Sequence, residues 1–190
     1  MIRAFLALPL PDPLRQRLML VQSLLYLPRQ GMRPVPPENL HLTLAFLGEQ
    51  PGPVLEDLHH ALESLRAPAF SLSLRGIEAF GGRAPRSVHA GVEPSEPLER
   101  LQRKVLRAVE IVGIAPERRR FTPHVTLARM DWRRLAEDDR GRFLQSVIAQ
   151  DAFRAGPAPI EAFALYRSDL GREGPHYDEL ARYGLEGAAA

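Results

Sequence analysis

Two short segments of the sequence place a histidine and a threonine two positions apart within an apolar run. The first is HLTL, with His41 and Thr43, and the second is HVTL, with His124 and Thr126. Successive side chains of a β-strand point to opposite faces, so each histidine shares a face with its threonine. The residues that alternate with them, as far as Phe46 in the first strand, belong to the other face, which we expect to be core. One face of each strand is then free to contact a ligand.

The pairing of two histidines with two threonines suits metal-free cleavage of a phosphodiester. An unperturbed imidazole has a pKa of about 6.5, so one histidine can be neutral and the other protonated near pH 7. Together they supply a general base and a general acid. A threonine hydroxyl about 7 Å along the same face can donate a hydrogen bond to a non-bridging phosphate oxygen. His41 and His124 are therefore candidate catalytic residues, and Thr43 and Thr126 are candidate substrate-binding residues.

The four remaining histidines carry weaker signals, because a single histidine on a strand or helix is more often structural than catalytic. His59 and His60 are adjacent on an expected helix, near Glu56, and such a cluster usually faces solvent. His89 could line a cleft by alternation, although packing at the edge of the core is its commoner role. His176 is expected in a surface turn. The duplicated His-x-Thr motif is a stronger functional signal than any of these histidines, since two copies are not expected from average composition.

The composition and motifs of the chain argue against several other kinds of active site. The chain contains no cysteine, so disulfides, thiolate metal sites and a cysteine nucleophile are excluded. Zinc sites need three or four ligands, and neither motif carries an acidic residue, so we expect no metal and no cofactor. There is no Gly-rich Walker loop, and the single lysine, Lys104, lies in an amphipathic helix, which argues against a lysyl-nucleotide ligase. The remaining cations are arginines, whose planar fork matches phosphate oxygens.

The hydrophobic periodicity predicts strands and helices that alternate irregularly, with strand pairs typical of hairpins, and therefore an α+β fold rather than a doubly wound sheet. A proline-rich loop is expected over 31–39. The expected strands are 2–8, 41–48, 70–80, 87–93, 124–130, 160–166 and 178–185, and the expected helices are 13–25, 54–65, 98–112 and 134–149.

The two motifs lie 83 positions apart, close to half of the 190 residues. A duplicated half that contributes one strand to a shared cleft explains this spacing, so we expect residues 1–190 to form a single two-lobed domain with one motif from each half. The 45% of hydrophobic residues are enough for a substantial core. The apolar N-terminal stretch is short, is interrupted by Pro9 and Pro11, and lacks a signal-peptide pattern. We expect a cytoplasmic protein with no membrane partner.

At these residues the sequence resembles the two-histidine phosphoesterase superfamily, and within it the RNA 2′,3′-cyclic phosphodiesterases, also called 2′-5′ RNA ligases. The resemblance runs over nearly the whole chain, through RAFLALPLP, PPENLHLTLAFLGE, FTPHVTLAR and ALYRSDLGREGPHYDELARYGL. It implies a bilobal, pseudo-twofold fold in which antiparallel-rich sheets line a central cleft, helices pack outside, and His41 and His124 face each other. The sequence departs from the family at Pro34 and His89, where tryptophan is common, and this affects the expected base-binding walls.

The resemblance also implies a reaction, in which water opens a terminal 2′,3′-cyclic phosphate and leaves a 2′-phosphomonoester. His124 would be the general base that deprotonates water, and His41 the general acid that protonates the leaving O3′. If the 5′-hydroxyl of a second RNA replaces water, the same machinery forms a 2′-5′ bond without ATP. The implied partner is RNA with a 2′,3′-cyclic phosphate end, or a cyclic nucleotide. We expect the protein to be a monomer.

Arg129, five positions after His124, is a further substrate-binding candidate. Regular alternation places it on the face of Val125 and Leu127, away from His124. The resemblance nevertheless favours contact with substrate, because an arginine at a strand end can stack on a base or grip a phosphate. The competing hypothesis for the whole chain is a non-catalytic nucleotide or RNA-phosphate binding module that uses the same cleft. Turnover of a cyclic-phosphate nucleotide distinguishes the two.

Overall fold

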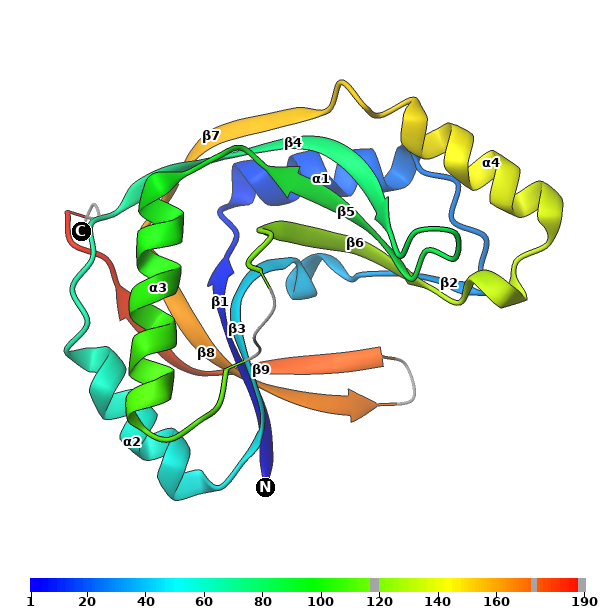
Figure 1. Cartoon of the computed structure of the whole chain (residues 1–190). Coiled ribbons are helices and arrows are strands. Elements are labelled where there is room, and N and C mark those ends of the chain that lie inside the picture. Colours follow the sequence, from blue (N-terminus) through cyan, green and yellow to red (C-terminus); the bar gives the residue numbers. More distant parts are fainter. Residues whose placement is uncertain (117–119, 172–173, 188–190) are drawn as a thin grey trace.

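The computed structural model, which describes residues 1–116, 120–171 and 174–187, has the α+β fold that the sequence predicts (Figure 1). The strands are β1 (Ile2–Pro9), β2 (Met32–Pro34), β3 (His41–Gln50), β4 (Phe70–Phe80), β5 (Ser87–Val92), β6 (His124–Met130), β7 (Arg154–Ile160), β8 (Ala162–Gly171) and β9 (Gly174–Gly184). The helices are α1 (Asp12–Leu24), α2 (Gly52–Glu63), α3 (Glu96–Ile111) and α4 (Glu137–Ile148), with short 3-10 turns at Pro37–Asn39 and Trp132–Arg134. None of the described helices is long and apolar enough to cross a membrane.

The described strands form one curled sheet in which neighbouring named strands run antiparallel (Figure 1). Their order is β7-β4-β5-β6-β3-β1-β8-β9, and β2 pairs with β6 beside this path. The two motif-bearing strands, β3 and β6, are therefore neighbours in the middle of the sheet. Each is flanked on its other side by a different strand, β1 for β3 and β5 for β6.

The two motifs meet at one residue pair, which relates them by a local twofold. Leu42 and Val125, the residues that follow the two histidines, are register partners, and both are fully buried. Because the strands are antiparallel, the chain runs in opposite directions through this pair. The two histidines thus lie on opposite sides of the pair. His41 is on the same side as Thr126, and His124 is on the same side as Thr43.

A β-bulge in β3 changes which side chains face the core. The register with β1 steps from Thr43 to Ala45, which makes Leu44 the extra residue of the bulge. Leu44 and Ala45 are consequently both buried, and Phe46 is 54% exposed. The prediction that Phe46 shares the core face is therefore wrong, because the bulge reverses the alternation after the motif.

β6 contains a bulge at the equivalent position. Its register with β5 steps from Thr126 to Ala128, so Leu127 is the extra residue, and Leu127 and Ala128 are both buried. Arg129 is exposed, and it follows a buried pair rather than a single buried residue. The bulge therefore turns Arg129 to the face of His124 and Thr126, and the prediction from regular alternation is wrong.

Helix α3 supports the first motif strand, β3, from behind. It begins at Ser95, whose Oγ accepts a hydrogen bond from the backbone N–H of Leu98 at 3.4 Å, with Pro97 in the first turn. Its buried stripe includes Leu101 and Val105, and the helix contacts β3. Full burial of an aliphatic side chain of this size stabilises the fold by about 1.5–3 kcal/mol. This packing fixes the apolar face of β3, which leaves the opposite, concave face for His41 and Thr43.

Two strands are missing from the sequence prediction, and a third region is longer than predicted. β7 has the sequence RAGPAPI, whose glycine and prolines are poor strand signals but are tolerated because β7 is an edge strand of the sheet. β2 lies within the predicted proline-rich loop and is only three residues long. β8 and β9 extend several residues beyond the predicted ranges 160–166 and 178–185, and they pair along their length.

Candidate active site

His41 is anchored at one ring nitrogen by the backbone. Its Nδ1 lies 2.7 Å from the carbonyl oxygen of Asn39. A carbonyl can only accept, so Nδ1 donates its hydrogen, and Nε2 carries the lone pair in the neutral ring. Asn39 is itself fixed, because its side-chain amide donates to the carbonyl oxygen of Pro175 at 2.8 Å. The turn before β3 is thereby tied to the start of β9.

His124 is anchored in the same way. Its Nδ1 lies 2.7 Å from the carbonyl oxygen of Thr122, two residues earlier in the chain, as Asn39 is for His41. Both neutral rings therefore hold the same tautomer and keep Nε2 for chemistry. Thr43 and Thr126 are half-buried, as are both histidines. The structure brings these four predicted residues together around the Leu42–Val125 pair.

Aromatic rings surround His41. The ring centroid of Phe5 lies 4.9 Å from that of His41, and Tyr177 meets His41 edge-on at 5.2 Å. Phe5 also stacks on Tyr166 at 5.3 Å. These residues line a hollow of about 230 Å³ beside His41, whose rim also carries Glu179 and other charged side chains.

Burial among these rings lowers the pKa of His41 to about 4. The positive charges of Arg129 and His124 lower it further, whereas the hydrogen bond to Asn39 acts in the opposite direction. His41 is therefore neutral at pH 7 in the free protein. This matters for its predicted role, because a general acid must hold a proton when it acts.

His89 stacks directly on His124. Their ring centroids are 4.2 Å apart with an interplanar angle of 10°, and Phe80 stacks beside both rings, 4.8 Å from His89 and 5.9 Å from His124. His89 is 6% exposed, as packing at the core edge predicts, but its ring also forms part of the site. Its Nε2 lies 2.6 Å from the hydroxyl of Ser87, and its Nδ1 is buried with no hydrogen-bond partner among the described residues.

Burial lowers the pKa of His89 to about 3, helped by the positive charges of His124 and Arg129. A neutral ring at this position can stack on His124 without placing a positive charge beside it. Arg129 acts on the pKa of both His41 and His89, so its guanidinium lies within electrostatic range of both halves of the site.

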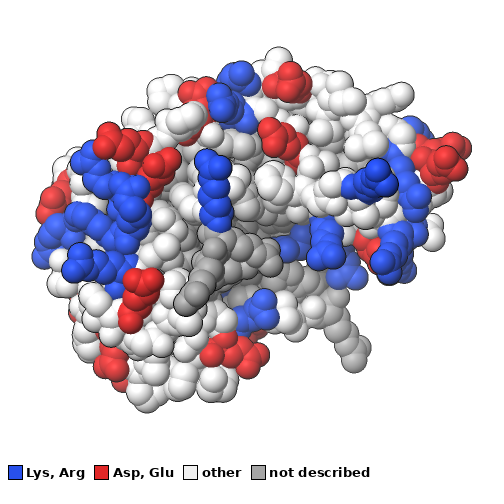
Figure 2. All heavy atoms as spheres, in the orientation of Figure 1, with Lys and Arg blue, Asp and Glu red and all other residues white. Residues whose placement is uncertain are grey.

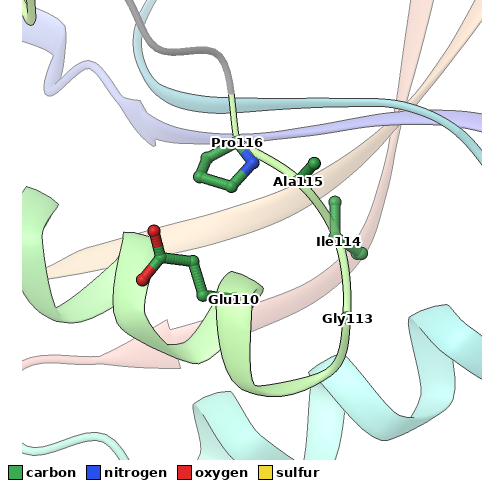
Figure 3. A pocket seen from close by; sticks show the side chains of 5 residues that line it. All are labelled: Glu110, Gly113, Ile114, Ala115 and Pro116. Carbon is green, nitrogen blue, oxygen red and sulfur yellow. The ribbon is translucent and has the colours of Figure 1, made fainter.

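A larger hollow lies elsewhere and lacks the groups for catalysis. It measures about 320 Å³ at the C-terminal end of α3 and is lined by Glu110, Gly113, Ile114, Ala115 and Pro116 (Figure 3). Glu110 is its single titratable lining residue. A lone carboxylate beside apolar atoms offers neither an acid–base pair nor a phosphate-binding cation.

The remaining histidines lie outside this site. In the described part of the chain, one group of His and carboxylate side chains is close enough to hold a metal ion, and it consists of His59, His60 and Glu63 on α2, within 4.8 Å of one another. Glu63, rather than the expected Glu56, is the carboxylate beside these histidines. His176 is exposed and contacts Asp178 at 3.0 Å, as expected for a surface residue.

Four aromatic residues of the site were not predicted from the sequence: Phe5, Phe80, Tyr166 and Tyr177. Phe5 reads as one more apolar residue of the first strand, and Phe80 as the last residue of another. The two tyrosines lie far from both motifs in the sequence and reach His41 through pairing of β1 with β8 and of β8 with β9. The segments LYRSDL and GPHY contained the only signal, and that signal came from the resemblance.

A comparison with protein-family models matches residues 10–172 to the 2′-5′ RNA ligase superfamily. The chain belongs to this superfamily. Among curated members, an RNA 2′,3′-cyclic phosphodiesterase of Thermus thermophilus is 35% identical over 98% of this chain and 91% of its own length. A protein of the same name from Aeropyrum pernix is 34% identical over 78% of this chain and 84% of its own length.

Solved structures of the superfamily share the fold. A crystal structure of a Thermus thermophilus protein matches with a TM-score of 0.79 and 32% identity, and covers 99% of this chain and all of that one (100%). Escherichia coli LigT complexed with 3′-AMP matches with a TM-score of 0.76 and 27% identity over 97% of this chain and 98% of that one. The curled antiparallel sheet is therefore the superfamily fold, as the resemblance implied.

Proposed function

We propose that this protein is an RNA 2′,3′-cyclic phosphodiesterase, a hydrolase that opens the cyclic phosphate at an RNA end to a 2′-phosphomonoester. The names of its relatives support this function. The observation that carries the mechanism is the twofold arrangement of the motifs around the Leu42–Val125 pair, with both histidines anchored through Nδ1. In this proposal, residues 1–190 act as a single two-lobed domain and a monomer.

The proposed reaction is an acid–base displacement at phosphorus. Nε2 of His124 accepts a proton from water while the water oxygen forms a bond to phosphorus. The bond between phosphorus and O3′ breaks, and Nε2 of His41 donates a proton to O3′. Thr43 and Thr126 donate hydrogen bonds to non-bridging oxygens, where negative charge increases in the transition state. Arg129 binds the substrate by charge.

The acid role of His41 depends on the substrate. In the free protein its pKa is about 4, but a phosphate anion in the site favours the protonated ring and raises that pKa. Substrate binding thus favours the protonated ring of His41 that a general acid requires. The opposite assignment, with His41 as base, would need no such change in the pKa of His41.

No metal or cofactor takes part in this mechanism. The described cluster of possible metal ligands lies on α2 and includes neither His41 nor His124. Two histidines also suffice for both proton transfers. If the 5′-hydroxyl of a second RNA replaces water as the nucleophile, its oxygen bonds to phosphorus, O3′ leaves with a proton from His41, and the same site gives ATP-independent 2′-5′ ligation.

The test uses a short RNA that ends in a 2′,3′-cyclic phosphate. The expected product has a 2′-phosphate and a free 3′-hydroxyl, identified by ³¹P NMR. His41→Ala and His124→Ala should each lower the rate at least about 10²-fold. His60→Ala, which removes an exposed histidine of α2, is the matched control and should leave the rate unchanged. Binding of the RNA without turnover would instead identify a non-catalytic binding module.

A further inference from the structure

Two arginines face each other on neighbouring strands next to the motif of β6. Arg33 on β2 and Arg129 on β6 are register partners, and both are exposed. Directly opposed side chains of an antiparallel pair lie on the same face, with their Cβ atoms about 4.5–5.5 Å apart. Like charges in this position repel and destabilise the pair. An anion bound between them removes that repulsion.

Neither arginine has a carboxylate partner in the part of the chain that the structure describes. Within residues 1–116, 120–171 and 174–187, no Asp or Glu oxygen lies within 4 Å of either guanidinium, and neither side chain donates a hydrogen bond. Arginines of β8 and β9 behave differently: Arg167 contacts Asp178 at 2.6 Å, and Arg182 contacts Glu179 at 2.7 Å. The pair on β2 and β6 can thus offer its donors to a ligand anion.

The position of the pair relates it to the candidate active site. The bulge at Leu127 turns Arg129 to the face of His124 and Thr126, so Arg33 lies on that face as well. Arg129 is three residues from Thr126, a separation of about 10 Å along an extended strand. The nucleotide adjacent to the reacting phosphate in an extended chain can span that distance. Figure 2 shows Lys and Arg side chains, in blue, distributed over the face that it draws.

The same row of the sheet continues with groups that suit a nucleotide. Ser87 on β5 is the register partner of Arg129, and Phe80 on β4 is the register partner of Ser87. The row therefore reads Arg33, Arg129, Ser87 and Phe80 across four adjacent strands. Phe80 is 39% exposed, so part of its ring is open for stacking by a base. Cations beside an exposed ring suit a nucleic acid strand better than a free inorganic anion.

We propose that Arg33 and Arg129 form a second phosphate site, which binds the phosphodiester adjacent to the reacting cyclic phosphate. The substrate class is then an RNA chain end, and a mononucleotide 2′,3′-cyclic phosphate, which lacks this phosphodiester, is a poorer substrate. This inference rests on the proposed function, because it assumes that the cyclic phosphate reacts between the two histidines.

The experiment compares kcat/KM for a dinucleotide and a mononucleotide that both end in a 2′,3′-cyclic phosphate. The wild-type protein should prefer the dinucleotide at least about tenfold, the effect of one or more charge-assisted hydrogen bonds to phosphate. Arg33→Gln should remove most of this preference by lowering kcat/KM for the dinucleotide alone, and Arg33→Lys should restore part of it. Arg107→Gln, which removes an exposed arginine of α3 without an ion pair in the described chain, should change neither substrate.

Binding supplies a readout that does not need turnover. Fluorescence anisotropy with labelled product analogues, a dinucleotide and a mononucleotide each ending in a 2′-phosphate, should show the same preference. Arg33→Gln should also make the salt dependence of dinucleotide affinity shallower by about 0.7 in the slope of log K against log salt. Circular dichroism establishes that each variant is folded.

The outcomes separate this inference from the proposed function. Equal kcat/KM for the two substrates in the wild type, or an equal loss for both in Arg33→Gln, would overturn the second phosphate site and leave the hydrolase intact. No turnover of either substrate, with dinucleotide binding that depends on Arg33, would overturn the hydrolase and support the phosphate site. No turnover and no chain-length preference in binding would overturn both.

Discussion

The protonation of His41 offers a direct test of the electrostatics of the site. Burial among Phe5 and Tyr177, together with the positive charges of Arg129 and His124, lowers its pKa to about 4 in the free protein. At pH 7 this is about three pH units above the pKa, so the protonated fraction is about one in a thousand. His41 can serve as the general acid only if substrate raises its pKa.

The required increase can be calculated. An opposite charge within about 4–6 Å shifts a pKa by about one to three units, so a bound phosphate should bring the pKa of His41 to between about 5 and 7. Each unit corresponds to about 1.4 kcal/mol of interaction between the protonated ring and the anion. The full shift of about three units therefore requires about 4 kcal/mol. This interaction also strengthens phosphate binding at low pH, because the anion and the proton bind together.

NMR titration of histidine ring protons measures this shift. His41→Asn assigns the resonance, and spectra are recorded from pH 3 to 8 with and without saturating 2′-AMP. We expect a midpoint near 4 without ligand and an increase of at least about one unit with it. Arg129→Gln should raise the ligand-free midpoint, because it removes one of the two charges that lower it. A ligand-free midpoint near 6.5, or one that 2′-AMP does not move, would refute the reasoning.

Three further predictions address stability, substrate binding and metal dependence. The pKa values of His41 and His89, about 4 and 3, lie below that of the unfolded chain, so unfolding takes up protons and the free energy of unfolding should fall as the pH drops below about 6.5. Between pH 7 and pH 5, the free energy of unfolding of His89→Phe, which keeps a ring against His124, should fall by about 2 kcal/mol less than that of the wild type, as measured by urea denaturation. An equal fall in both proteins would mean that His89 titrates normally. Arg129→Ala should raise KM more than it lowers kcat, with partial recovery in Arg129→Lys, and steady-state kinetics that show a fall in kcat alone would instead make Arg129 a transition-state contact. Hydrolysis should continue in excess EDTA, and loss of activity that a divalent metal restores would contradict the metal-free mechanism.

Most of the regular elements could be predicted because their hydrophobic periods are undisturbed. The helix that became α3 shows this best, since its buried stripe follows a single helical spacing from Leu98 to Val109. The motif residues were also predictable, because His and Thr at a spacing of two share a face whatever the strand pairs with. β7 could not be predicted, since its glycine and prolines are acceptable only at a sheet edge, and sequence does not reveal which strand lies there.

The bulges mark the main limit of reading faces from sequence. HLTLAF and HVTLAR look like regular alternation, but an extra residue in each strand reverses the faces of Phe46 and Arg129. Bulges depend on the partner strand, so nothing in either hexapeptide alone reveals them. The rings around His41 were hidden for a related reason: Tyr177 reaches the site only through the order of strands in the sheet.

The joint between β3 and β6 has a mechanical consequence. Long ladders connect most neighbouring strands, but Leu42 and Val125 form the single register pair between these two. The two histidines therefore lie on either side of the strand pair that has the fewest register partners among the described strands. Packing behind the sheet, rather than a row of peptide hydrogen bonds, sets their separation. We therefore expect a tilt of β3 against β6 to break few main-chain hydrogen bonds. Such a tilt would change the gap between the two imidazoles.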